Sequence, residues 1–307
     1  MDVFLTLLVK LLPLYLIMGL GYVAVKVLKV ERTSIARLLI YMVAPAVVFY
    51  GVSQTPISLA TLSLPFLFFF LCCSLGLVFW VVGSWVWGKE STKNLLAYAA
   101  GDGNTGYFGL PVALILFDEK VLGLVVLSML GFILYENTLG FFMMARGNYS
   151  LRDSLVRMSK LPAVYAFLAG VAVAALGWIF PQPVVDFFQY FKASYSLLGM
   201  MVIGMGLATA TRSSFDGKFI GLAFFAKFIL WPAIVFGLIW LDQTYFHFYN
   251  ADIYGVMILM AIVPLAANTV TFATELKVHP EKAAVTVSLS TVFALVYIPV
   301  IVMFFLS

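Results

Sequence analysis

Charged side chains are scarce in this sequence. Only 10% of its 307 residues are Asp, Glu, Lys or Arg, whereas roughly 25% is usual in a soluble domain. Hydrophobic residues make up 64% of the chain, against about 45–50% in soluble domains. Because a soluble fold has too little interior to hide that much apolar surface, the composition excludes a soluble domain and predicts a chain surrounded by lipid.

Cysteine and histidine are also rare, with two of each. Cys72 and Cys73 are neighbours within an apolar run, so they cannot join distant segments by disulfides. The absence of an H-E-x-x-H sequence argues against a zinc hydrolase, and the absence of G-x-x-x-x-G-K-[ST] excludes a P-loop ATPase. We therefore expect neither a metal ion nor a cofactor, and no nucleic acid partner.

Long apolar stretches follow one another with only short connections between them. A helix needs about 20 apolar residues to cross a bilayer, and ten stretches reach roughly that length. They predict an all-α polytopic membrane protein without a soluble domain. The predicted spans are Val3–Leu28, Ile35–Val52, Leu62–Val86, Leu95–Phe117, Val121–Ala145, Leu161–Phe180, Phe187–Ala208, Phe219–Leu241, Ile253–Leu276 and Ala283–Leu306.

Lysine and arginine are divided unevenly among the connections. Each connection is numbered by the span that it follows. Of the 18 lysines and arginines, fourteen lie in or beside the odd-numbered connections, and two, Lys120 and Lys192, lie in the even-numbered ones. The other two, Lys10 and Lys227, lie within spans. The positive-inside rule then places the odd connections in the cytoplasm and both termini outside. We expect an integral protein of a bacterial inner membrane.

The longest basic connection, residues 147–160, separates two sets of five spans, residues 1–146 and 161–307. An odd number of spans per set gives the two sets opposite orientations, which is the inverted repeat of many secondary transporters. The repeat is visible where spans four and nine each contain a proline and an Asn-Thr pair: Asn104, Thr105 and Pro111 in the first set, and Pro264, Asn268 and Thr269 in the second.

The segment Gly101–Pro111 interrupts the fourth span with four glycines and a proline. Irregular backbone at membrane depth is tolerated where it is buried in protein or lines a wet cavity, so we expect a broken helix that faces the interior. The alternative is an ordinary kink absorbed by neighbouring helices. The matching pattern in the ninth span favours the broken helix.

Two broken helices that meet near the middle of the membrane would form an anion site. The N-terminus of each second half-helix carries about half a positive charge and unpaired N–H groups. Asn104, Thr105, Asn268 and Thr269 would add polar groups, and Tyr107 a ring that stacks on a planar ligand. We therefore expect a small organic anion, a carboxylate, as the substrate.

The motif NTGYFGLP at 104–111 resembles the signature of the auxin efflux carrier family of permeases. The segment VPLAAN at 263–268, followed by Glu275 and His279, does so too, and the resemblance extends over essentially the whole chain. It implies ten helices in inverted repeats, with helices four and nine crossing at their prolines. It also implies export or exchange of organic anions such as auxin or dicarboxylates, with substrate contacts at Asn104, Pro111, Pro264 and Asn268. Asp102 and Leu265 depart from the family pattern.

Three charges lie well inside the predicted spans: Asp102, Glu136 and Lys227. Such charges are costly in lipid and normally face the protein interior. We interpret Glu136 as a carboxylate that couples a proton to transport, or as the partner of Lys227 in a structural ion pair; Lys227 is also a candidate anion ligand. Asp102 is a candidate site for a proton or a cation such as sodium. The sequence leaves the coupling ion and a homodimer open.

Three function classes remain for comparison. A secondary transporter that works by alternating access explains the paired broken helices. A channel or a non-transporting ligand sensor with the same site is the alternative. A membrane-embedded aspartyl protease needs two aspartates, and no aspartate besides Asp102 lies deep in a predicted span, so we expect no enzyme.

Overall fold

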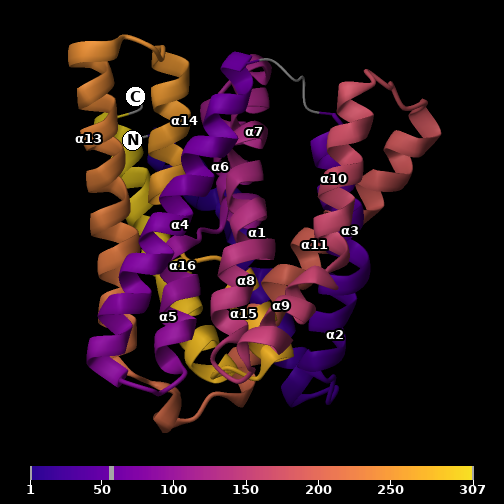
Figure 1. Cartoon of the computed structure of the whole chain (residues 1–307), viewed down its shortest axis with the longest axis vertical. Helices are drawn as coiled ribbons and strands as arrows, with labels where there is room; N and C mark the ends of the chain where they lie inside the picture. Colours follow the sequence, from indigo (N-terminus) through magenta and orange to yellow (C-terminus); the bar gives the residue numbers. More distant parts are fainter. Residues whose placement is uncertain (1, 55–58, 306–307) are drawn as a thin grey trace.

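The computed structural model describes residues 2–54 and 59–305, and all regular structure in that part of the chain is helical (Figure 1). Segments labelled η are short π-helical turns, except η4, which is a 3-10 helix. The elements up to residue 159 are α1 (Asp2–Lys26), α2 (Arg32–Leu38), η1 (Leu39–Val43), α3 (Ala44–Ser53), α4 (Leu59–Trp87), α5 (Thr92–Gly101), η2 (Thr105–Gly109), α6 (Leu110–Leu116), α7 (Glu119–Tyr135), η3 (Glu136–Gly140), α8 (Phe141–Ala145) and α9 (Leu151–Ser159). The later elements are α10 (Pro162–Ala175), α11 (Gln182–Thr209), η4 (Arg212–Ser214), α12 (Gly217–Phe224), η5 (Phe225–Leu230), α13 (Trp231–Leu241), η6 (Asp242–Phe246), α14 (Ala251–Ile262), α15 (Asn268–Leu276) and α16 (Pro280–Phe305).

Six helical segments within the described residues are long and apolar enough to cross a membrane, and α9 with α10, bent by 45°, would make a seventh. Helix is present in every predicted stretch, but the fourth and ninth stretches are each divided into shorter helices, α5 with α6 and α14 with α15. The all-α class is confirmed, with six clear apolar spans. The count of ten stays a prediction.

One group of helices forms around α11. This helix packs along α1 and also contacts α3, which in turn packs on α10. A Cβ atom on Gly21 would lie 2.1 Å from the carbonyl oxygen of Met201, and one on Gly204 would lie 1.8 Å from that of Met18. Only glycine fits such contacts, so these two positions allow the backbones of α1 and α11 to touch, as small residues do in membrane helix pairs.

The second group contains α4, α5, α7, α8 and the helices from α12 to α16. In Figure 1, α4, α5, α13 and α14 stand to the left, and α2, α3 and α10 to the right. Trp231 of α13 is fully buried and stacks on Phe132 of α7, with ring centroids 5.5 Å apart. Its indole N–H donates a 2.8 Å hydrogen bond to the carbonyl oxygen of Ala100. These contacts fix the end of α5 against α7 and α13.

The odd-numbered connections meet at one end of the molecule. Arg32 pairs with Glu281 at 2.9 Å, which joins the start of α2 to α16. Lys282 pairs with Asp216 at 3.1 Å, joining α16 to the start of α12. Asn148 donates to the carbonyl oxygens of Leu276 and Lys277, which brings in the α8–α9 connection. The basic connections thus share one face, as expected if they all lie on the same side of the membrane.

The placement of Lys192 in an even-numbered connection was wrong. The helix α11 runs from Gln182 to Thr209, so Lys192 lies well inside it. The helix begins earlier than predicted because Pro181 and Pro183 initiate it, and proline suits a helix start, where its missing N–H costs nothing.

Candidate functional site

Two interrupted helical segments touch each other. Residues 102–104, between α5 and η2, are not helical, and neither are residues 263–267, between α14 and α15. The backbone N–H of Asn104 donates a 2.8 Å hydrogen bond to the carbonyl oxygen of Pro264. Each interruption therefore satisfies part of the unpaired backbone of the other, which is what irregular structure in an apolar surrounding requires.

Asn104 also starts the helix that follows the first interruption. Its side-chain oxygen accepts a 3.1 Å hydrogen bond from the N–H of Tyr107, the usual arrangement of an N-cap. Pro111 lies further along, at the start of α6. The side-chain nitrogen of Asn104 is buried and has no hydrogen-bond partner among the described residues. The residue thus caps one helix and keeps a donor free.

The start of α15 is built differently. The N–H groups of Thr269 and Val270 donate to the carbonyl oxygens of Ala266 and Ala267, at 3.1 and 3.0 Å. This tight turn uses donors that we expected to be free for an anion. The two helix starts are therefore not equivalent, and the first one offers more to a ligand.

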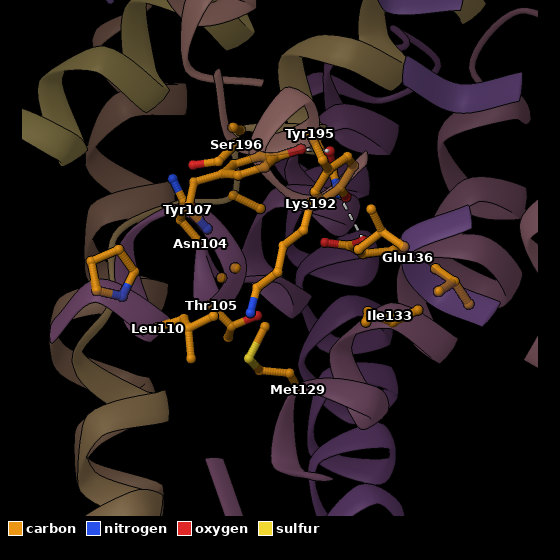
Figure 2. Close-up of a pocket in the computed structure, with 18 of the residues that line it drawn as sticks. Asn104, Thr105, Tyr107, Leu110, Met129, Ile133, Glu136, Lys192, Tyr195 and Ser196 are labelled. Atoms are coloured by element: carbon orange, nitrogen blue, oxygen red, sulfur yellow. Dashed lines mark hydrogen bonds between the residues drawn. The ribbon is translucent and has the colours of Figure 1, made fainter. Parts of the chain in front are cut away.

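A cavity of about 370 Å³ lies beside the two interruptions (Figure 2). It lies where α3 and α11 of the first group face α7 of the second, and η2, α6 and residues 266–268 complete its wall. The lining residues are Val47, Val48, Gly103, Asn104, Thr105, Gly106, Tyr107, Leu110, Pro111, Leu114, Met129, Ile133, Glu136, Gln189, Lys192, Ala193, Tyr195, Ser196, Ala266, Ala267 and Asn268.

Six of the candidate residues from the sequence line this cavity: Asn104, Thr105, Tyr107, Pro111, Glu136 and Asn268. Pro264 and Thr269 are outside its lining. Pro264 contributes the backbone oxygen that Asn104 binds, and the buried hydroxyl of Thr269 has no hydrogen-bond partner among the described residues. Six of the predicted residues thus lie on the wall of one cavity, and Pro264 and Thr269 lie outside it.

Asn268 is held by three side chains. Its amide nitrogen donates to the carboxylate of Glu136 and to the hydroxyl of Tyr195, each over 2.9 Å. The hydroxyl of Tyr107 donates to its oxygen over 3.5 Å, and the rings of Tyr107 and Tyr195 lie with centroids 4.7 Å apart. One amide thus connects η3, η2 and α11 across the cavity wall.

Asp102 and Lys227 are fully buried but do not line the cavity. One carboxylate oxygen of Asp102 accepts from the N–H of Gly103 at 2.7 Å. The other oxygen, like the ammonium of Lys227, makes no hydrogen bond within the described part of the chain. That ammonium lies 4.6 Å from the ring centroid of Trp231 and 2.5 Å from where a Cβ atom on Gly103 would be.

No ion pair joins Glu136 and Lys227 among the residues that the structure describes. Asp102 instead interacts electrostatically with both groups. Two carboxylates and one lysine therefore form a buried cluster next to the cavity, and Glu136 is the member of it that reaches the cavity wall.

Several lining residues on α11 were missed by the sequence analysis, namely Gln189, Lys192, Tyr195 and Ser196. A signal was present, because Gln189, Lys192 and Ser196 stand at positions i, i+3 and i+7 of an apolar stretch, which is one face of a helix. The assignment of Lys192 to a connection hid this pattern. Within the described residues, no cluster of three or more His, Cys, Asp or Glu that could hold a metal ion is found.

Comparison with known proteins gives three findings. A family model described as membrane transport protein matches residues 6–154 and 150–302. An uncharacterized transporter from Methanocaldococcus jannaschii is 25% identical over 308 residues, which cover 97% of this chain and 96% of that protein. A Rhizobium meliloti protein named "Putative malonate transporter" is 24% identical over 305 residues, covering 92% and 91% of the two chains.

Proposed function

The chain belongs to the membrane transport protein family and is a transporter rather than an enzyme, and we propose that it moves a small organic anion across the membrane by alternating access. The family match confirms the resemblance to the auxin efflux carrier family that the two motifs predicted. Because the sequence has no P-loop, a secondary transporter, driven by a gradient rather than by ATP, fits it best.

The observation that carries this proposal is the cavity at the contact between the two interrupted segments. Its wall is mostly apolar, yet Asn104, Thr105 and Asn268 bring polar groups to it from both segments. Binding sites in transporters are commonly formed by such discontinuous helices. The cavity also lies between the two groups of helices, so a movement of one group against the other would open it to either side of the membrane.

A carboxylate substrate is supported by the first helix start. The buried amide nitrogen of Asn104 lacks a partner, and η2 with α6 presents its N-terminus at the cavity. A partly positive helix end and a free N–H donor suit a carboxylate oxygen. A relative is named as a malonate transporter, which favours a short dicarboxylate as the first compound to test.

The ten-span topology with inverted repeats is part of the proposal. Two helix contacts support it: α1, the first predicted span, packs on α11, the seventh, and α3, in the second, packs on α10, in the sixth. If each span is replaced by its counterpart in the other set of five, the contact between spans one and seven becomes the contact between spans six and two. An inverted repeat requires this correspondence. The charged connections at one end would then face the cytoplasm, with both termini outside.

Glu136 is the proposed coupling group. Its carboxylate lines the cavity and accepts a hydrogen bond from Asn268, so a change in its protonation state would alter a contact of the cavity wall. A proton that binds there would remove a negative charge from the wall as the anion enters. Asp102 and Lys227 would then balance the remaining charge next to it.

The decisive experiment is counterflow with purified protein in liposomes, using labelled malonate outside and unlabelled malonate inside. Saturable uptake that is accelerated by internal malonate would establish a transporter of this anion. An ion current that does not saturate would identify a channel, and binding without flux would identify a sensor; either result would overturn the proposal.

A further inference from the structure

An unpaired lysine points into the candidate site. Lys192 lines the cavity, and Figure 2 shows its side chain extended into it from α11. Its ammonium makes no ion pair and no hydrogen bond with any other described residue. The position is ten residues beyond Gln182, the first residue of α11, or about 15 Å along the helix at 1.5 Å per residue.

The position of this charge has a physical cost. A lysine placed inside a membrane span costs several kcal/mol unless it reaches water or a partner, and such residues commonly mark substrate pathways. Long lysine side chains near a helix end often extend to the membrane surface instead. Lys192 is turned into the cavity, on the same helix face as Gln189 and Ser196, which also line it.

The two charged side chains on the cavity wall differ in the contacts that they make. That wall contains one acidic and one basic side chain, Glu136 and Lys192. Glu136 already accepts a hydrogen bond from Asn268 and belongs to the buried cluster with Asp102. Lys192 is exposed and makes no such contact with a described residue, so an anion in the cavity would meet a free ammonium on the α11 side.

A second unpaired donor contributes to the same cavity from another element. The amide nitrogen of Asn104 is buried, has no partner among the described residues, and belongs to a residue that lines the cavity at the start of η2. Lys192 comes from α11, a separate helix. Two unpaired donors on different elements can be satisfied together by one ligand that has an acceptor group at each end.

We propose that Lys192 binds the second carboxylate of a short dicarboxylate whose first carboxylate lies at Asn104, and that this contact makes the site select dicarboxylates over monocarboxylates. The inference rests on the proposed function, since it assigns a role within the same site. The second carboxylate adds a negative charge to a cavity that already contains Glu136, and the ammonium offsets that charge.

The test compares malonate with its monomethyl ester, which has the same backbone and one charge fewer. Affinities are measured by titration calorimetry on detergent-solubilised wild type, Lys192→Gln and Lys192→Arg. In Lys192→Gln, malonate should bind about 10- to 100-fold more weakly, as expected for a lost charge-assisted contact. The ester should lose less than about threefold, and Lys192→Arg should restore most of the preference.

The matched control is Lys218→Gln, which neutralises an exposed lysine of α12 outside the cavity lining and should leave both affinities unchanged. Equal unfolding temperatures without ligand show that the variants are folded. An unchanged ratio of malonate to ester affinity in Lys192→Gln overturns the inference while the proposed function stands. If the wild type neither binds malonate nor shows counterflow, the dicarboxylate assignment is overturned both in this inference and in the proposed function.

Discussion

The side-chain amide of Asn268 donates a 2.9 Å hydrogen bond to the carboxylate of Glu136 and so joins the start of α15 to η3. The two residues are 132 positions apart in the chain, and each lines the cavity. A ligand that attracts the amide and a proton that neutralises the carboxylate both act on this one bond. In the proposed function, substrate and proton would therefore have a direct route by which to influence each other.

Replacing Glu136 with Gln should abolish the pH dependence of transport. Glutamine keeps an acceptor for Asn268 but cannot ionise, so the bond survives in weaker form, with a loss of about 1 kcal/mol. The measurement is the initial rate of malonate uptake into liposomes from acidic to alkaline pH. Glu275→Gln is the control, because Glu275 pairs with Arg37 away from the cavity. A pH profile like that of the wild type in Glu136→Gln would remove Glu136 as the coupling group.

The two roles of Asn104 can be separated by two substitutions. Asn104→Asp keeps an oxygen that can accept from Tyr107, so the cap remains, but it removes the free donor and brings a negative charge to a buried position, so anion binding should be lost and some stability with it. Asn104→Ala loses the cap as well, at a cost of about 0.5–2 kcal/mol. Thermal unfolding with and without malonate measures both effects. Full ligand stabilisation in Asn104→Asp would contradict a binding role.

Asp102 and Lys227 should compensate each other energetically. Both are fully buried and interact electrostatically, so removing either charge leaves the other uncompensated. Asp102→Asn and Lys227→Met should each destabilise the protein by about 3–5 kcal/mol, as is typical of a broken buried pair. The double variant should recover much of that loss. Unfolding of the four proteins in detergent gives the coupling, and additive losses would show that the two charges do not pair.

Lys282 should stabilise the basic end of the molecule in a pH-dependent way. The pKa of Glu90 is below its ordinary value because the hydroxyl of Thr92 and the ammonium of Lys282 both donate hydrogen bonds to it. Burial raises the pKa of Asp216, but hydrogen bonds from the N–H of Phe219 and from Lys282 lower it by more. A lowered pKa means stability that is complete above the ordinary pKa and is lost as the pH falls through the folded value.

The corresponding variant is Lys282→Met. At neutral pH it should unfold more easily than the wild type, by about 0.5–1 kcal/mol as for partly exposed ion pairs, and the gap should close as both carboxylates become protonated in acid. Thermal unfolding across a pH series measures the gap. Lys89→Met, a change within the same loop as Glu90, should show no such trend. A gap that stays constant down to acid pH would mean that Lys282 acts by packing alone.

The sequence was most informative where one segment could be judged alone. The four glycines and the proline of Gly101–Pro111 are incompatible with a regular helix in lipid, and a helix break is present there. Asn104 and Asn268 were predicted because a proline and an Asn-Thr pair occur in both the fourth and the ninth span, and both residues line the cavity. Lys192 was missed because it was counted with the connection before the seventh span, although the predicted span Phe187–Ala208 already contained it.

Sequence alone determined the membrane class, the helical structure and the places where helices break, because lipid imposes those constraints on each segment separately. Only the tertiary structure decided which residues meet. The bond between Asn104 and Pro264, the bond between Asn268 and Glu136, and the orientation of Lys192 all depend on how separate helices pack. Packing depends on side-chain shape across distant segments, as at Gly21 and Gly204, and composition does not contain that information.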